Sequence, residues 1–518
     1  MDPEVEQMKT VKKRRSNSIV RIILVGLSLL IQTAWLLVLV LRLNEYYAWI
    51  SLATSLLSAI VVLKLFTMPT NTAQKLSWIF LILVFPVMGL TLYILVGLFG
   101  DPVSTGKRLN AVRKEMQPVL WQDKQVTDFL RKTDIPAANL SGYLENYTGS
   151  PLYGNTDVRY YPEGKQALQD MKEALEQAEH FIFMEYFIVE DGSAFREIQE
   201  ILVRKAAQGV EVRLLYDDFG SIGYVNLKFC RRLNEQGIRC RIFNPALPFL
   251  NLFMNNRDHR KITVIDGKVG FTGGYNLADE YFDRTHPYGK WKDTGIRLEG
   301  EAVRSLTATF LELWHVTTLE KEDYGTYLDI RHSVPARGWV QPFGDDPLSP
   351  ERAGENVYLN LAAQAQHRLW ISTPYLIITD EMTRALTLAA KRGVDVRILV
   401  PGIPDKKTVY QVTRSYFSSL AQQGVKIYAY TPGFCHAKMC VCDGRIATIG
   451  TSNLDYRSLY LHFENNVLLY DCDAVSDMVR DFEETFPLCE DITRKYCIGL
   501  RGIVMLWQCL LRLFAPLL

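Results

Sequence analysis

An internal repeat constrains the fold of this 518-residue chain more than any other feature. The segment KAAQGVEVRLLYDD is echoed by AAKRGVDVRILVPG, and RRLNEQGIRCRIFNP is echoed by SSLAQQGVKIYAYTP. Each segment has the pattern of a helix that ends at glycine and is followed by a strand. Because strands that alternate with helices form a helix-covered sheet, the repeat predicts an α/β sandwich with a mixed sheet, duplicated within one chain.

The same short polar pattern, H-x-K-x4-D, follows the last of these strands in each copy. Both copies continue into a glycine-containing turn that ends in asparagine. One match is compatible with chance, whereas two matches with similar downstream sequences indicate a shared function. The residues are His259, Lys261, Asp266 and Asn276 in the first copy and His436, Lys438, Asp443 and Asn453 in the second.

The residue types in this pattern suit the cleavage of a phosphodiester. Side chains two apart in a strand lie on one face, so each histidine stands beside its lysine. A neutral imidazole can attack phosphorus while a second, protonated imidazole gives a proton to the leaving alkoxide. The two ammonium groups offset charge on the phosphoryl oxygens, and the asparagines supply neutral donors. We therefore expect a reaction that needs no metal and no cofactor.

The pattern also has structural and metal-binding interpretations. An isolated histidine is more often structural than catalytic, but the matched pair favours catalysis. A metal site of histidines and aspartates is disfavoured because the intervening lysines repel a metal ion. For Asp266 and Asp443, a direct role in the chemistry and pairing with a lysine or with backbone donors fit the pattern equally well.

The two motifs resemble those of the phospholipase D superfamily, and nearly the whole chain resembles a bacterial cardiolipin synthase. GGYNLADEYF and GTSNLDYRSLYLHFENN carry this resemblance downstream of the motifs. It implies catalytic roles for all six His, Lys and Asp residues. It also implies that the acid downstream of each motif, Asp293 or Glu464, orients the histidine of that motif. Gly274 becomes Thr451 in the second copy, a variation that the family tolerates.

The resemblance implies a membrane phosphatidyltransferase that condenses two phosphatidylglycerol molecules into cardiolipin and glycerol. A phosphohistidine intermediate is expected on His259, with His436 as acid and base; hydrolysis of the phospholipase D type is the alternative. The expected partners are phosphatidylglycerol and membrane lipid. A net charge of +1 and the lack of aromatic residues beside basic runs argue against a nucleic acid partner. Intact residues in both copies argue against a non-enzymatic scaffold.

Three apolar stretches near the N-terminus each approach the roughly 20 residues of a membrane helix. They cover residues 19–41, 46–66 and 76–99, and predict two or three transmembrane helices in a multi-pass protein of the bacterial cell membrane. Pro86 and Gly89 either kink the third stretch or make it re-entrant. Basic residues on both sides of the stretches leave the orientation of the chain open.

The chain therefore divides into five predicted segments. These are a membrane region (1–100), a connecting segment (101–157), a first half (158–338), a second half (339–490) and a C-terminal segment (491–518). The last segment is apolar with a few arginines, which suits either a helix in the membrane interface or a packing helix.

Overall fold

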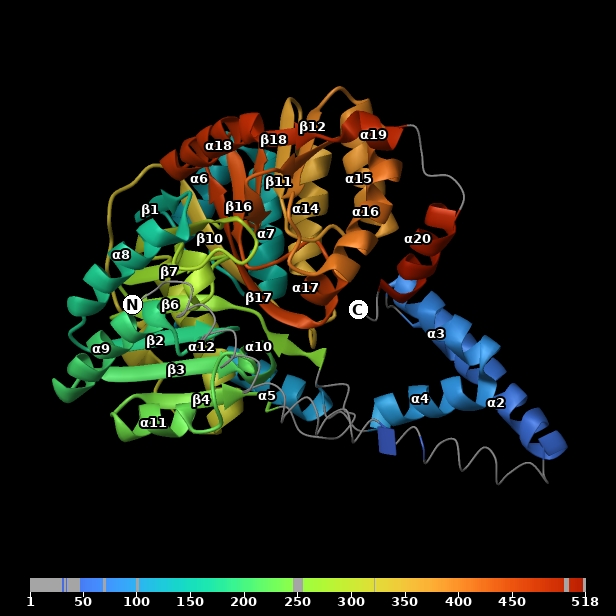
Figure 1. Cartoon of the computed structure of the whole chain (residues 1–518). Helices are drawn as coiled ribbons and strands as arrows, with labels where there is room; N and C mark the ends of the chain where they lie inside the picture. The colour runs from blue at the N-terminus through green and yellow to red at the C-terminus, as the bar shows by residue number, and fades with distance from the viewer. Residues whose placement is uncertain are drawn as a thin grey trace, which may run out of the picture.

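Two sheets with matching strand order form the body of the molecule (Figure 1). This computed structural model describes residues 47–68, 71–98, 102–245, 255–320, 322–497 and 503–515, together with residues 30, 31 and 34. The first sheet has the order β1-β9-β7-β6-β2-β3-β4. Its strands are β1 (Thr156–Tyr161), β2 (Phe181–Tyr186), β3 (Glu211–Asp217), β4 (Arg239–Phe243), β6 (Lys261–Ile265), β7 (Val269–Gly273) and β9 (Gly295–Gly300).

The second sheet repeats this order as β10-β17-β16-β15-β11-β12-β13 and adds β18 at its edge. In both sheets the three strands from the repeated segments are parallel, and the motif strand is antiparallel to its neighbour. The duplicated α/β fold with mixed sheets is therefore confirmed. The strands are β10 (Trp339–Asp345), β11 (Arg368–Ser372), β12 (Asp395–Pro401), β13 (Lys426–Tyr430), β15 (Met439–Cys442), β16 (Ile446–Gly450), β17 (His462–Tyr470) and β18 (Cys489–Asp491).

Equivalent glycines end equivalent helices in the two halves. Gly209 follows α9 (Ser193–Ala207) and Gly393 follows α15 (Asp380–Lys391), with φ angles of 91° and 94°. Most L-residues are strained at such angles, so glycine is the residue that allows the chain to leave the helix and enter the next strand. This shared requirement explains why the repeat is readable in the sequence.

Each sheet carries helices on its outer face, and the two inner faces share one core. The outer helices of the first sheet are α8 (Gly164–Glu176), α9 (Ser193–Ala207) and α11 (Phe229–Glu235). Those of the second sheet are α14 (Ala353–Gln364), α15 (Asp380–Lys391) and α16 (Lys407–Ala421). The shared core contains α12 (Val303–Thr318) and α18 (Asp473–Thr485).

The shared core makes the two halves dependent on one another. Phe183 and Val264 of the first sheet belong to the same buried cluster as Val441 and Val467 of the second. A fully buried aliphatic or aromatic side chain stabilises a fold by about 1.5–3 kcal/mol. Separating the halves would expose this cluster to water, so the two halves depend on one another for stability.

Shorter and connecting helices complete the body. The connecting segment forms three helices, two of which pack on the outer side of the second half and one on the shared core. These are α5 (Pro102–Met116), α6 (Lys124–Thr133) and α7 (Ile135–Thr148). The short helices are α10 (Asp218–Ser221), η3 (Asp279–Phe282), α13 (Gly325–Leu328), α17 (Tyr456–Tyr460), η4 (Phe486–Leu488) and α19 (Thr493–Cys497).

Three apolar helices at the N-terminal end project away from the body (Figure 1). They are α2 (Tyr47–Thr67), α3 (Thr72–Val84) and α4 (Pro86–Leu98). The third apolar stretch of the sequence is therefore broken at Pro86, and α4 folds against α3 so closely that a Cβ on Gly89 would lie 2.5 Å from the carbonyl oxygen of Leu81. The break at Pro86 is compatible with both predicted arrangements. The first predicted stretch, 19–41, lies almost entirely outside the described residues.

The predicted transmembrane helices are not confirmed by this structure. Across the described ranges, every helix falls short of the combined length and apolar character needed to span a bilayer. Many exposed large apolar side chains nevertheless lie on these helices, and they include Leu56, Ile60, Leu63, Phe66, Leu76, Phe80 and Leu83.

The C-terminal segment forms α20 (Ile503–Phe514), which packs on α16 and α3. The Ser77 hydroxyl donates a hydrogen bond to the Leu513 carbonyl at 2.7 Å, and the Arg512 guanidinium lies 3.9 Å from the centre of the Tyr416 ring. The helix thus contacts both the body and the N-terminal helices. Trp507 and Leu510 remain exposed on it.

Candidate active site

The two motif histidines lie where each half is hydrogen-bonded to the other. β5 (Arg257–Asp258) leads into His259 and pairs with β17 of the second half, and the His259 amide donates to the Phe463 carbonyl at 2.9 Å. β14 (Gly433–Cys435) leads into His436 and pairs with β8 (Lys290–Lys292) of the first half, and the His436 amide donates to the Lys292 carbonyl at 2.7 Å. These two equivalent strand pairs, each made of one strand from either half, hold both histidines at the junction of the halves.

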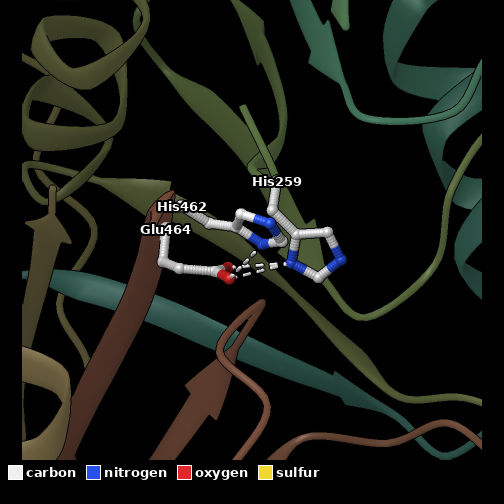
Figure 2. A group of neighbouring side chains, drawn as sticks. All are labelled: His259, His462 and Glu464. Carbon is white, nitrogen blue, oxygen red and sulfur yellow. Dashed lines mark hydrogen bonds and ion pairs between the residues drawn. The ribbon is translucent and has the colours of Figure 1, made fainter. Parts of the chain in front are cut away.

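Each histidine meets an acid that comes from the opposite half. Nδ1 of His259 lies 3.0 Å from both carboxylate oxygens of Glu464 (Figure 2). Nδ1 of His436 lies 2.6 Å from Oδ2 of Asp293. The expectation that each acid orients the histidine of its own motif is therefore wrong in its pairing. The strand exchange at the junction carries each acid to the other motif.

The lysines point into the same junction and are fully buried. Nζ of Lys261 donates to the His259 carbonyl at 2.6 Å. Nζ of Lys438 donates to the His436 carbonyl at 2.5 Å and also lies 2.7 Å from Nδ1 of His436. His436 therefore has both a donor and an acceptor beside Nδ1, whereas hydrogen bonds from Nδ1 of His259 go to a carboxylate alone. This is the main chemical difference between the two sites.

Burial leaves both imidazoles neutral near pH 7 before substrate binds. It lowers the pKa of His259 to about 3, although Glu464 acts in the opposite direction. Burial, with the charges of Lys438 and Lys261, lowers the pKa of His436 well below its ordinary value. A neutral imidazole that donates its Nδ1 proton to an acid has a free lone pair on Nε2.

Burial and mutual attraction also shift the pKa values of the acids and lysines in the junction. Burial raises the pKa of Asp293 to about 6 against the attraction of Lys438. For Glu464, burial is outweighed by the attraction and hydrogen bond of His259, so its pKa lies well below the ordinary value. Burial lowers the pKa of Lys261 to about 7 and that of Lys438 to about 8, against the attraction of Glu464 and Asp293.

The motif aspartates do not join this cluster. Asp266 accepts hydrogen bonds from the backbone amides of residues 179–181, and Asp443 accepts them from residues 366–368, all at 2.7–2.9 Å. Both stand at the end of their strands opposite the histidines, with φ angles of 51° and 52°. Of the roles that the pattern left open, the structure shows the pairing with backbone donors.

The two asparagines have different surroundings. Asn276 is held by the protein, because its carbonyl accepts from the Ile188 amide at 3.0 Å and its amide donates to the Tyr281 hydroxyl at 2.8 Å. The side-chain carbonyl of Asn453 is buried and has no hydrogen-bond partner among the described residues. The side-chain carbonyl of Asn453 is thus available for a further hydrogen bond, whereas both ends of the Asn276 amide are already hydrogen-bonded.

The change from Gly274 to Thr451 between the copies has a steric reason. A Cβ on Gly274 would lie 2.0 Å from a carboxylate oxygen of Asp293, so this site excludes any side chain. In the other copy, the Thr451 hydroxyl donates to Glu464 and helps to hold that carboxylate toward His259. Asp293 is therefore accommodated by the absence of a side chain at Gly274, whereas Glu464 is held by a hydrogen bond from Thr451.

His462 belongs to the site and was missed by the sequence reasoning. Its ring is 5.5 Å from the ring of His259, and its Nδ1 is 3.7 Å from Oε1 of Glu464 (Figure 2). Ligand atoms of His259, His462 and Glu464 all lie within 4.8 Å of one another, a set that can hold a metal ion. The H-x-E spacing on one strand face is the signal that could have found it.

Comparison with known proteins identifies the family. A family model described as "Cardiolipin synthase, PLD-like domain" matches residues 171–314 and 358–486, which cover both halves of the sandwich. The chain belongs to the cardiolipin synthase family of the phospholipase D superfamily. A second model, "Phospholipase_D-nuclease N-terminal", matches residues 55–97 of this cardiolipin synthase family member.

Relatives within the cardiolipin synthase family match most of the chain. A cardiolipin synthase of Halalkalibacterium halodurans is 36% identical over 84% of this chain and 88% of its own length. Cardiolipin synthase 2 of Bacillus anthracis is 36% identical over 82% of each chain. An uncharacterized protein of Streptococcus mutans is 41% identical over 88% of this chain and 99% of its own. The chain is an enzyme of this family.

A solved structure shares the fold. The crystal structure of phosphatidylserine synthase from Haemophilus influenzae Rd KW20 superposes with a TM-score of 0.54 at 15% identity. It covers 73% of this chain and 97% of the other. This similarity concerns the duplicated sandwich alone.

Proposed function

We propose that this enzyme transfers the phosphatidyl group of one phosphatidylglycerol to a second, giving cardiolipin and glycerol. The observation that carries the proposal is the pair of buried histidines, each hydrogen-bonded through Nδ1 to an acid of the opposite half. Two imidazoles and two lysines in one junction supply a nucleophile, an acid and charge compensation for phosphodiester transfer. The cardiolipin synthases among the relatives support the choice of lipid.

In the first step, Nε2 of His259 attacks phosphorus and the bond from phosphorus to the glycerol headgroup breaks. The bound phosphodiester anion raises the pKa of His436, which becomes protonated and gives its Nε2 proton to the departing glycerol oxygen. In the second step, His436 takes the proton from a hydroxyl of the second phosphatidylglycerol. That oxygen attacks phosphorus and the bond from phosphorus to His259 breaks.

The surroundings of Nδ1 support His259 as the nucleophile. Its Nδ1 faces the Glu464 carboxylate, which keeps the proton on Nδ1 and the lone pair on Nε2. Nδ1 of His436 faces both the Asp293 carboxylate at 2.6 Å and the Lys438 ammonium at 2.7 Å, so its surroundings fix the proton on Nδ1 less strictly than those of His259. Arg260, the neighbour that distinguishes the first motif in sequence, is ion-paired with Glu185 at 2.9 Å, so its charge is compensated there.

We further propose that the enzyme works at the bacterial cell membrane as a multi-pass protein. The support is the apolar surface of α2, α3 and α4, which extends onto α20 through exposed Trp507 and Leu510. α20 packs on α16, and Asn71 of the N-terminal region donates to the Tyr460 hydroxyl at 2.9 Å. Tyr460 lies on α17, close in sequence to Asn453, so the apolar helices are attached near the site.

The product of the reaction distinguishes transfer from hydrolysis. Purified full-length enzyme is incubated in micelles with phosphatidylglycerol alone, and lipids are quantified by mass spectrometry. We expect cardiolipin as the dominant product, with one glycerol released per cardiolipin, because lipid hydroxyls are concentrated at the site. Phosphatidic acid as the dominant product would move the enzyme to the phospholipase D reaction.

The dependence of kcat/KM on pH tests the charge-compensating role of the lysines. Their pKa values of about 7 and 8 mean that both ammonium groups lose protons as the pH rises through this range. We expect kcat/KM, which reports the free enzyme, to fall above pH 7 and by about tenfold or more per pH unit above pH 8. The fall in kcat should occur at higher pH, because bound phosphodiester stabilises the ammonium forms. Measurement in neutral detergent micelles avoids surface-charge effects, and a kcat/KM that is flat to pH 9 would contradict this role.

A further inference from the structure

The two pseudo-equivalent sites differ in the aromatic residue beside the histidine. Trp291 stands two positions before Asp293, and His462 stands two positions before Glu464. The Trp291 ring lies 5.5 Å from the His436 ring, and the His462 ring lies 5.5 Å from the His259 ring. An imidazole thus occupies, at one site, the place that an indole occupies at the other.

His462 is a buried polar group without a hydrogen bond. Its side chain is 8% exposed, and within the described part of the chain neither ring nitrogen has a hydrogen-bond partner. The 3.7 Å separation from Glu464 is too long for a hydrogen bond. A buried polar group that lacks a hydrogen bond of normal length destabilises the fold. At the other site the Trp291 indole N–H is likewise buried without a hydrogen-bond partner among the described residues, but it is a donor only, whereas the imidazole of His462 offers a lone pair.

The geometry around His462 matches a metal-binding donor set. Figure 2 shows the imidazoles of His259 and His462 turned toward the carboxylate of Glu464. Two imidazoles and one carboxylate are the protein ligands of many zinc sites, with bonds of about 2.0–2.2 Å and a further position for water. Ligand atoms that already lie within 4.8 Å of one another need shifts of about an ångström to reach such bonds.

The charge of the junction also permits a dication. Lys261 and Lys438 are offset by Glu464 and Asp293, all of them buried in the same junction. A cation that enters beside Glu464 therefore meets two ammonium groups and two carboxylates. The lysines weaken binding and the carboxylates favour it, so we expect reversible binding.

We propose that His259, His462 and Glu464 bind a borderline divalent cation of the zinc type, and that this ion switches the transferase off. The inhibition rests on the proposed role of His259 as the nucleophile, whereas the binding site itself does not.

Inhibition follows from the two nitrogens of one imidazole. A neutral imidazole has one ring nitrogen with a lone pair and one with a proton. When the metal takes the lone pair of Nδ1 in His259, the proton moves from Nδ1 to Nε2, and no proton is released. Nε2 then has no lone pair with which to attack phosphorus, and Glu464 bonds to the metal instead of accepting from His259. Removal of the metal reverses each change.

The second site cannot form the same trio. Trp291 has no lone pair to offer a metal, because the indole nitrogen is a donor only. The Lys438 ammonium also lies 2.7 Å from Nδ1 of His436, where a metal would have to bind. One metal ion per chain is therefore expected, at the site that contains His259.

Binding is measured first, without substrate. Full-length enzyme in detergent is treated with chelator and titrated with Co²⁺, whose visible absorption reports tetrahedral coordination by nitrogen and oxygen. We expect one His462-dependent site in the wild type and its loss in His462→Asn. His462→Trp copies the other half and should lose the site as well. His332→Asn is the control, because His332 lies 3.5 Å from Glu299 outside this site.

Inhibition is then measured with Zn²⁺ during phosphatidylglycerol condensation. Each variant is compared with its own metal-free rate, and thermal melting confirms that it is folded. We expect the half-inhibiting Zn²⁺ concentration to rise at least about tenfold in both His462 variants and to stay unchanged in His332→Asn. Chelation should not lower the wild-type rate.

The outcomes separate this inference from the proposed function. Equal Co²⁺ binding by wild type and both His462 variants overturns the metal site. His462-dependent binding with an unchanged rate overturns the inhibition. A rate that chelation abolishes and Zn²⁺ alone restores also overturns it. If condensation is absent but Co²⁺ binding depends on His462, the proposed function fails while the metal site stands.

Discussion

Replacing either motif histidine with alanine is expected to reduce cardiolipin formation by about 10³-fold or more. His259→Ala removes the atom that forms the covalent bond to phosphorus. His436→Ala removes the group that gives a proton to the leaving glycerol. The initial rate of cardiolipin formation from phosphatidylglycerol in micelles, followed by mass spectrometry, checks both variants.

A matched control separates catalysis from folding. His332→Ala removes a partly buried histidine that lies near Glu299, outside the junction of the halves, and should keep its rate within about twofold. All three variants should show wild-type thermal melting within a few degrees. Either junction variant with a near-wild-type rate would contradict the two-histidine mechanism.

Replacing Glu464 or Asp293, the acids that contact a histidine of the opposite half, should lower kcat almost as much as replacing the histidines. Glu464→Gln and Asp293→Asn keep the size of each side chain but replace a carboxylate acceptor with an amide. An amide NH₂ facing Nδ1 favours the tautomer with its proton on Nε2, and neither amide stabilises an imidazolium. We expect each change to lower kcat by about 10²- to 10⁴-fold, with a smaller effect on KM.

Glu299→Gln is the matched control for these two variants. Glu299 is an acid of the first sheet that pairs with Arg297 at 2.6 Å, far along β9 from Asp293. It should leave kcat within about twofold. Two results would show that Glu464 and Asp293 do not orient the histidines. One is an equally large fall in kcat for Glu299→Gln. The other is a higher KM with an unchanged kcat for Glu464→Gln and Asp293→Asn.

The repeat and the placement of histidine beside lysine were predictable, because both depend on local patterns. Glycines such as Gly209 and Gly393 occupy positions that the backbone restricts, so they mark equivalent helix ends. The placement of His259 beside Lys261 was predicted from the alternation of side chains in an extended segment, although His259 lies between β5 and β6 rather than within a strand. These local rules were enough to predict a duplicated α/β sandwich with two matched motifs.

The pairing of acids with histidines was not predictable from spacing. Glu464 reaches His259 because β5 of one half bonds to β17 of the other, a contact between residues about two hundred positions apart. The role of Asp266 was equally hidden, since its partners are backbone amides at the start of β2. His462 escaped notice because its significance depends on proximity to His259 in three dimensions.

Trapping the covalent intermediate tests the central claim most directly. Enzyme is mixed with phosphatidylglycerol labelled in the phosphatidyl group, quenched in conditions that preserve phosphohistidine, digested and mapped by mass spectrometry. We predict the label on the peptide that contains His259 and its loss in His259→Ala. Label on the His436 peptide alone would reverse the roles, and rapid turnover with label on neither histidine would contradict covalent transfer.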